Sequence, residues 1–178
     1  MSGKKELAEK AKEEMRLSER ILAEIPGFRG YKEKEIRRET DKLIRNSLYR
    51  KLTEARKDLK EVFQQLSDQR LHEVLTDMDR LVMRFDRVSE KINHASYGYA
   101  GFFNIVKVEE EKLDKMIDFD SSLVSDVKKI VEETGTFKGE VRKRKFKGAK
   151  KRIEKLRDLL ESLEKAFDER EGTILGVK

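Results

Sequence analysis

The sequence contains no cysteine and no tryptophan, and it has one proline and two histidines. Without a thiol the chain forms no disulfide, no thiolate zinc site and no cysteine nucleophile. It also lacks a run of about 18 apolar residues, so no membrane-spanning helix is expected. The first ten residues carry charges instead of the apolar core of a signal peptide, which favours a cytoplasmic protein.

Charged residues dominate the composition and favour helices over strands. Asp, Glu, Lys and Arg make up 44% of the chain, whereas hydrophobic residues make up 37%. Together with the single proline, this composition is typical of long, solvent-exposed helices. The density of Glu and Lys also resembles that of heat-adapted proteins, so a thermophilic source is predicted.

The spacing of apolar residues predicts helices along most of the chain. Apolar residues repeat at steps of three and four, which places them on one face of a helix. Such stripes lie within residues 7–25, 78–95, 113–131 and 149–167. The clearest stripe consists of Leu48, Leu52, Ala55, Leu59, Val62 and Leu66.

These stripes predict an all-α fold of about five helices. The expected helices cover residues 4–25, 31–66, 69–96, 105–134 and 140–170, with glycines or the proline between most of them. Short connections make consecutive helices antiparallel. We therefore expect a single domain over residues 1–178, an elongated up-and-down antiparallel bundle with coiled-coil-like packing and a loosely docked N-terminal helix, 1–25.

Two loops share the pattern glycine, aromatic, any residue, glycine, aromatic. They cover residues 27–31 and 98–102, and in an antiparallel bundle both lie at the same end. Two interpretations stay open: the rings close the end of the core, or they form an exposed tip that binds a partner helix, a membrane interface or stacked bases. The candidate tip residues are Phe28, Tyr31, Tyr97, Tyr99, Phe102 and Phe103.

Two segments resemble a known family. Residues 25–35 read IPGFRGYKEKE and are followed by Arg37 and Arg38, and residues 97–103 read YGYAGFF. Over about residues 20–120 the chain resembles an uncharacterised family of prokaryotic helical proteins. The resemblance implies a cytoplasmic, prokaryotic helical protein, and it carries over no activity and no catalytic residue.

The positive charge of the chain is concentrated in one segment. Nine of the residues from 138 to 152 are Lys or Arg and one is acidic, whereas acids outnumber bases by 35 to 33 elsewhere. The apolar stripe extended back from Ala149 meets Arg142 and Gly139, so residues 136–148 are expected to form a flexible basic connection. Dense cations favour an anionic ligand such as phosphate, and a solvated charged end is the alternative. The candidate polyanion-binding residues are Arg142, Lys143, Arg144, Lys145, Lys147, Lys150, Lys151 and Arg152.

Residues suited to catalysis or metal binding are sparse. His94 follows Glu90 by four residues and His72 adjoins Glu73, but the chain lacks the repeated Glu-x-x-His motif of di-metal bundles. It also lacks a phosphate-binding glycine loop and a dinucleotide fingerprint. We predict a protein that is not an enzyme, with no catalytic residue, no metal site and no cofactor.

Two functions of different classes follow from these features. The first is a non-enzymatic helical interaction or scaffold module, which contacts another protein or itself through the aromatic loops or a flank of the bundle. The alternative is sequence-nonspecific binding of nucleic acid or another polyanion through residues 138–152. Peripheral contact with an anionic membrane surface also stays open.

Overall fold

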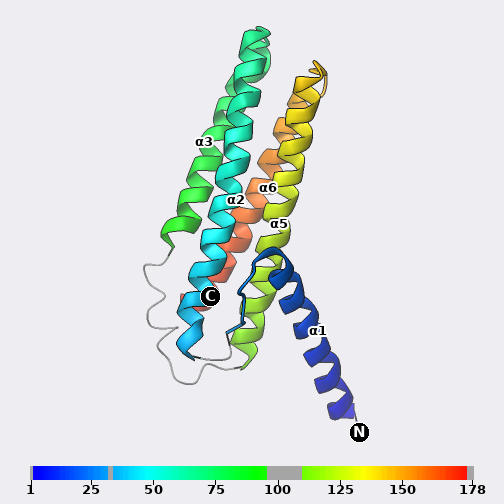
Figure 1. Cartoon of the computed structure of the whole chain (residues 1–178), viewed down its shortest axis with the longest axis vertical. Coiled ribbons are helices and arrows are strands. Elements are labelled where there is room, and N and C mark those ends of the chain that lie inside the picture. The colour runs from blue at the N-terminus through cyan, green and yellow to red at the C-terminus, as the bar shows by residue number, and fades with distance from the viewer. Residues whose placement is uncertain (1, 32–33, 96–109, 176–178) are drawn as a thin grey trace. The chain divides into compact units, whose positions relative to one another are not determined.

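The fold consists of packed α-helices. The computed structural model describes residues 2–31, 34–95 and 110–175. Its helices are α1 (Ser2–Glu24), α2 (Lys34–Asp68), α3 (His72–His94), α5 (Glu110–Arg142) and α6 (Ala149–Leu175) (Figure 1). The described residues contain no strand. The predicted all-α bundle is therefore confirmed.

Helix α5 extends further than its glycines predicted. The expected break at Gly135 is wrong, because the helix continues through this residue to its end at Arg142. Phe137 and Val141 are buried and continue the apolar face of the helix. Burying a large apolar side chain contributes about 1.5–3 kcal/mol, which exceeds the roughly 1 kcal/mol that a helical glycine costs. The connection between α5 and α6 is thereby shortened to residues 143–148.

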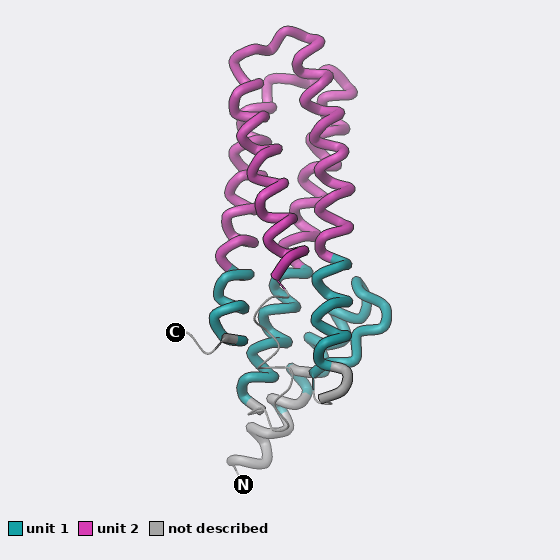
Figure 2. The backbone as a smooth tube through the Cα atoms, turned by 90° about the vertical axis from the view of Figure 1, so that its left-hand side faces the viewer, with its two compact units in different colours: residues 1–47, 96–124, 166–178 teal, residues 48–95, 125–165 magenta. Residues whose placement is uncertain are grey.

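The chain divides into two compact units (Figure 2). Unit 1 spans residues 1–47, 96–124 and 166–178, and unit 2 spans residues 48–95 and 125–165. Helices α2, α5 and α6 each contribute one stretch to each unit. Both units are thus assembled from segments that are distant in the sequence. The sequence predicted one helical domain and did not predict this division.

Unit 2 is a bundle of four helix segments made from two antiparallel hairpins, α2 with α3 and α5 with α6 (Figure 1). Leu59, Phe85 and Leu160 are fully buried in its core. The two hairpins pack with α3 beside α6 and α2 beside α5, so the ring order is α2, α3, α6, α5. Ion pairs join each neighbouring pair: Arg56 with Asp86, Arg84 with Glu161, Arg152 with Glu133, and Lys138 with Asp58.

Unit 1 contains a buried polar network. Arg170 of α6 donates from Nε to Oδ1 of Asp120 on α5 and from Nη2 to Oδ1 of Asp41 on α2, both at 2.8 Å. The hydroxyl of Tyr31 donates to Oδ2 of Asp120 at 2.6 Å and accepts from Nη2 of Arg170 at 3.1 Å. Burial raises the pKa of Asp120, and the charge of Arg170 partly offsets this shift. The network therefore ties three helices to the segment that precedes α2.

Candidate nucleic-acid interface

The turn between α5 and α6 has a defined backbone. The amide of Arg144 donates to the carbonyl of Val141, and the amide of Lys145 donates to the carbonyl of Glu140, both at 2.9 Å. Arg144 has a φ of 56°, in the left-handed region. This pair of hydrogen bonds with a left-handed residue is a Schellman motif, which satisfies the last carbonyls of a helix. The basic residues of this segment are thus carried by a regular helix end.

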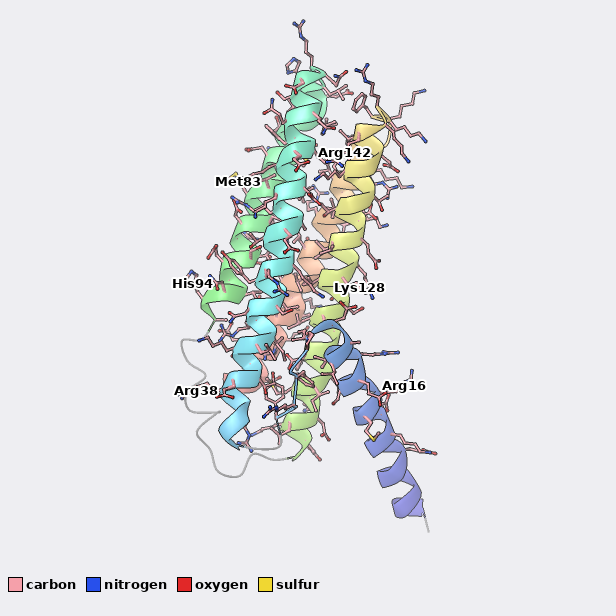
Figure 3. All side chains as sticks on the ribbon, in the orientation of Figure 1. Arg16, Arg38, Met83, His94, Lys128 and Arg142 are labelled. Atoms are coloured by element: carbon pink, nitrogen blue, oxygen red, sulfur yellow. The ribbon has the colours of Figure 1, made fainter. Side chains whose placement is uncertain are left out.

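The candidate cation Arg142 and its neighbour Lys138 pair with acids of α2. Nζ of Lys138 lies 2.6 Å from Oδ1 of Asp58 and 2.7 Å from Oε2 of Glu61. Nη2 of Arg142, which is labelled in Figure 3, lies 3.2 Å from Oε2 of Glu61. The side chain of Arg142 remains 60% exposed, so it still faces solvent beside the turn.

Arg152 is engaged within the protein, which corrects its assignment as a polyanion-binding residue. Its Nε and Nη2 donate to the two carboxylate oxygens of Glu140 at 3.0 and 2.6 Å. Its Nη1 donates to Oε1 of Glu133 at 2.6 Å, and Lys155 donates to the other oxygen of Glu133 at 2.6 Å. Such bidentate, charge-assisted hydrogen bonds are strong. Arg152 therefore fastens α6 to α5 instead of offering a free charge.

The other six candidates remain exposed to solvent. None of them makes an ion pair within the part of the chain that the structure describes. They lie in the turn and in the first helical turn of α6, and residues 143–151 contain no acid. One of them, Lys145, is close enough to Glu140 for its charge to help lower the pKa of that carboxyl group. We call this set the basic turn: Lys143, Arg144, Lys145, Lys147, Lys150 and Lys151.

A second left-handed arginine lies at the same end of unit 2. Arg70 has a φ of 56° in the connection between α2 and α3. Its amide donates to the carbonyl of Ser67 at 2.8 Å, and the amide of Leu71 donates to the carbonyl of Leu66 at 3.1 Å, which is again a Schellman motif. Arg70 is exposed. No sequence pattern indicated this arginine, because the predicted helix 69–96 begins before Arg70, whereas α3 begins at His72.

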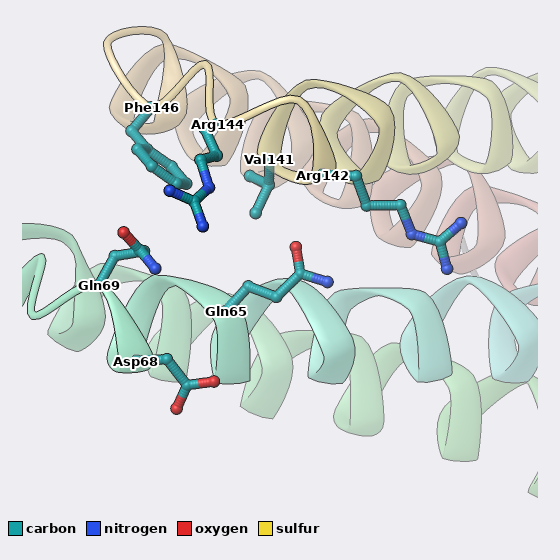
Figure 4. A pocket seen from close by; sticks show the side chains of 7 residues that line it. All are labelled: Gln65, Asp68, Gln69, Val141, Arg142, Arg144 and Phe146. Carbon is teal, nitrogen blue, oxygen red and sulfur yellow. The ribbon is translucent and has the colours of Figure 1, made fainter.

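A hollow of about 180 Å³ lies between the end of α2 and the basic turn (Figure 4). Gln65 of α2 and Gln69, which directly follows α2, extend toward it, and the half-buried ring of Phe146 lies beside the guanidinium group of Arg144. The carboxylate of Asp68 points away from these side chains. The hollow thus combines a ring face, two amides and cations. Its lining consists of Gln65, Asp68, Gln69, Val141, Arg142, Arg144 and Phe146.

The acids that bind Arg152 have lowered pKa values. Burial alone raises the pKa of Glu133, but the hydrogen bonds and charges of Lys155 and Arg152 outweigh it and bring the pKa below 4.5. The hydrogen bond from Arg152 is the main cause that lowers the pKa of Glu140. The fold therefore favours the ionised form of both carboxyl groups.

A pH dependence of stability follows. Because the folded pKa values lie below the unfolded value of 4.5, the stabilisation is complete above that pH and is lost as the pH falls through the folded values. We expect Glu133→Gln to lower the free energy of unfolding at pH 7 by roughly 1 kcal/mol, or about 2–4 °C in Tm. At pH 3 the difference from the parent should shrink. An unchanged difference in thermal melts at the two pH values would contradict this.

The aromatic candidates separate into two groups. Phe28 and Tyr31 are buried, 6% and 0% exposed, with ring centroids 6.3 Å apart in an edge-to-face arrangement. Their assignment to an exposed, partner-binding tip is therefore wrong, because both rings belong to the core of unit 1. The remaining candidates, Tyr97, Tyr99, Phe102 and Phe103, lie outside the described residues.

The pair formed by His94 and Glu90 lies on the surface. Nε2 of His94 is 3.1 Å from Oε2 of Glu90, and both side chains are more than half exposed. Within the described residues, no group of three or more His, Asp or Glu side chains is arranged to hold a metal ion. No helix among these residues is both long enough and apolar enough to cross a membrane.

Comparison of the chain with protein-family models, with curated proteins and with solved structures gave no match. The assignment of a function therefore depends on the side chains at the basic turn.

Proposed function

We propose that this protein binds nucleic acid without sequence specificity through the basic turn. The observation that carries the proposal is the six exposed cations within nine residues, which make no ion pair in the described part of the chain. Closely spaced like charges repel one another, and phosphates relieve that repulsion while releasing their own counterions. The nearest other cations, Lys138, Arg142 and Arg152, each form an ion pair with an acid. Six exposed cations that form no ion pair in the described residues thus lie beside cations that do form ion pairs, and only Lys145 among the six is near enough to an acid, Glu140, to lower its pKa.

The geometry of the turn supports the proposal. A Schellman motif defines the backbone at Arg144, and Arg152 links the start of α6 to Glu133 and Glu140 of α5. Cations on a defined backbone lose less backbone freedom on binding than cations on a disordered tail. The sequence carries no recognisable DNA-binding or RNA-binding motif, so the proposal requires contacts to phosphates alone.

The interaction or scaffold module stays a prediction. Phe28 and Tyr31 are buried and are no longer candidates for its contact surface. The remaining candidates are the bundle flanks and the aromatic side chains within residues 97–103, which lie outside the described residues. A partner protein that uses the flanks would not need the basic turn. The two functions are therefore separable by experiment.

The test replaces four lysines of the basic turn by glutamine: Lys143, Lys145, Lys147 and Lys150. We expect the affinity for a fluorescent 20-nucleotide RNA of mixed sequence to fall at least about tenfold at roughly 0.1 M salt, since about four phosphate contacts are lost. Fluorescence anisotropy measures this directly.

The matched control removes the same number of charges elsewhere on unit 2. Its four substitutions to glutamine fall at exposed positions of α2 and α6: Arg50, Lys57, Lys60 and Arg157. The control should bind RNA nearly as well as the parent protein. Equal losses in both variants would mean that net charge, and not the basic turn, determines the binding.

A further inference from the structure

The hollow beside the basic turn has a lining that differs from that of a simple phosphate site. Gln65 and Gln69 each offer an amide N–H₂ donor and a carbonyl acceptor. Phe146 offers a flat face that is half-buried. A phosphate requires neither the ring nor the acceptors, whereas a nucleobase uses both, by stacking on its face and by hydrogen bonding at its edge.

The size and surroundings of the hollow agree with a single base. Its volume of about 180 Å³ is below the roughly 300–1,000 Å³ of sites for drug-sized ligands, which suits one planar ring system. The basic turn borders it through Arg144, so a base in the hollow would leave its backbone phosphates next to the exposed cations (Figure 4). The carboxylate of Asp68, the acid of the lining, points away from the hollow.

Arg144 provides a second, independent observation. A left-handed residue at the end of a helix is usually glycine, because a side chain is strained in this conformation. The chain instead carries an arginine at a φ of 56° and directs its guanidinium group to the hollow. Arg70 has the same φ and does not line the hollow, so it is the direction of the Arg144 guanidinium group that supports a site here.

We infer that this hollow is a subsite for one unpaired nucleobase, stacked on Phe146 and flanked by Gln65, Gln69 and Arg144. The inference rests on the proposed nucleic-acid function and adds a preference for single strands, because bases in a duplex are not available for stacking on a side chain. Recognition of the base edge is not specific, since each amide rotates to present a donor or an acceptor.

The test compares the binding of a 20-nucleotide single strand and of the matching duplex, both at the same salt concentration. The parent protein should bind the single strand at least about fivefold more tightly. The variant Phe146→Leu, which keeps an apolar side chain and removes the ring, should lose roughly 5- to 100-fold in affinity for the single strand. Its affinity for the duplex should change less than twofold.

The variant Arg144→Gly separates binding from folding. Glycine relieves the strain of the left-handed position, so the Tm should rise by about 2–4 °C, while single-strand affinity falls at least about threefold. Unchanged single-strand binding by both variants would overturn the subsite, although binding that still required the lysines of the basic turn would leave the proposed function standing. Absence of binding to either nucleic acid would overturn both.

Discussion

Replacing Arg170 with methionine should lower the free energy of unfolding by about 3–5 kcal/mol, because it breaks a buried ionic network by removing one partner. The side chain of Arg170 is 1% exposed, and it contacts Asp41 and Asp120, which are 2% and 0% exposed. Methionine is of similar length but leaves Asp120 buried without a cation. Asp41 keeps the hydrogen bond that it accepts from Nε of Arg45 at 2.8 Å.

Chemical denaturation measures this effect, and Arg157→Met is the matched control. Arg157 lies on the same helix and is exposed, so its replacement should change the free energy of unfolding by less than about 0.5 kcal/mol. In the Arg170 variant the pKa of Asp120 should also rise further, since burial already raises it and the charge that opposes this shift is gone. Similar stabilities of the two methionine variants would show that the network does not stabilise unit 1.

Replacing Phe85 with alanine should lower the free energy of unfolding by about 3–5 kcal/mol. Phe85 is fully buried in unit 2, and the substitution removes its apolar contacts and leaves a cavity in a close-packed core. The expected loss is comparable to that of Arg170→Met, although its cause is apolar packing instead of an unpaired charge.

The control for the second substitution is two residues away on the same helix. Met83 is 64% exposed (Figure 3), so Met83→Ala should cost less than about 0.5 kcal/mol. Urea unfolding followed by circular dichroism compares the two variants. If Phe85→Ala were as stable as the parent, the packing described for unit 2 would be wrong.

The apolar seams of the helices could be predicted from the sequence, whereas the buried network could not. Steps of three and four predicted the burial of Phe85 and its neighbours, because this periodicity is local to each helix. Arg170 continues such a seam, three residues after Phe167 and four before Ile174. An arginine within an otherwise apolar seam was the one sign in the sequence that this charged side chain is buried. Its partners, Asp41 and Asp120, lie 129 and 50 residues away, and spacing within a helix gives no information about such pairs.

In the basic segment, too, contacts between residues distant in the sequence could not be predicted. Composition predicted a local excess of cations, but it did not predict which of them are neutralised. Arg152 is paired because Glu133, almost twenty residues earlier, lies on the neighbouring helix. The continuation of α5 through Gly135 could not be predicted either, because the apolar stripe within residues 113–131 ends before Phe137 and Val141 and a glycine follows it.

The measurement that tests the central claim most directly is the salt dependence of binding to a single-stranded 20-nucleotide RNA. With up to six exposed cations in the basic turn, a plot of log affinity against log salt should be linear, with a slope between about −2 and −4. Replacing the four lysines by glutamine removes four of the six cations and should reduce the slope by about two thirds. Absence of binding at low salt, or a slope that the four substitutions leave unchanged, would contradict a nucleic-acid function of the basic turn.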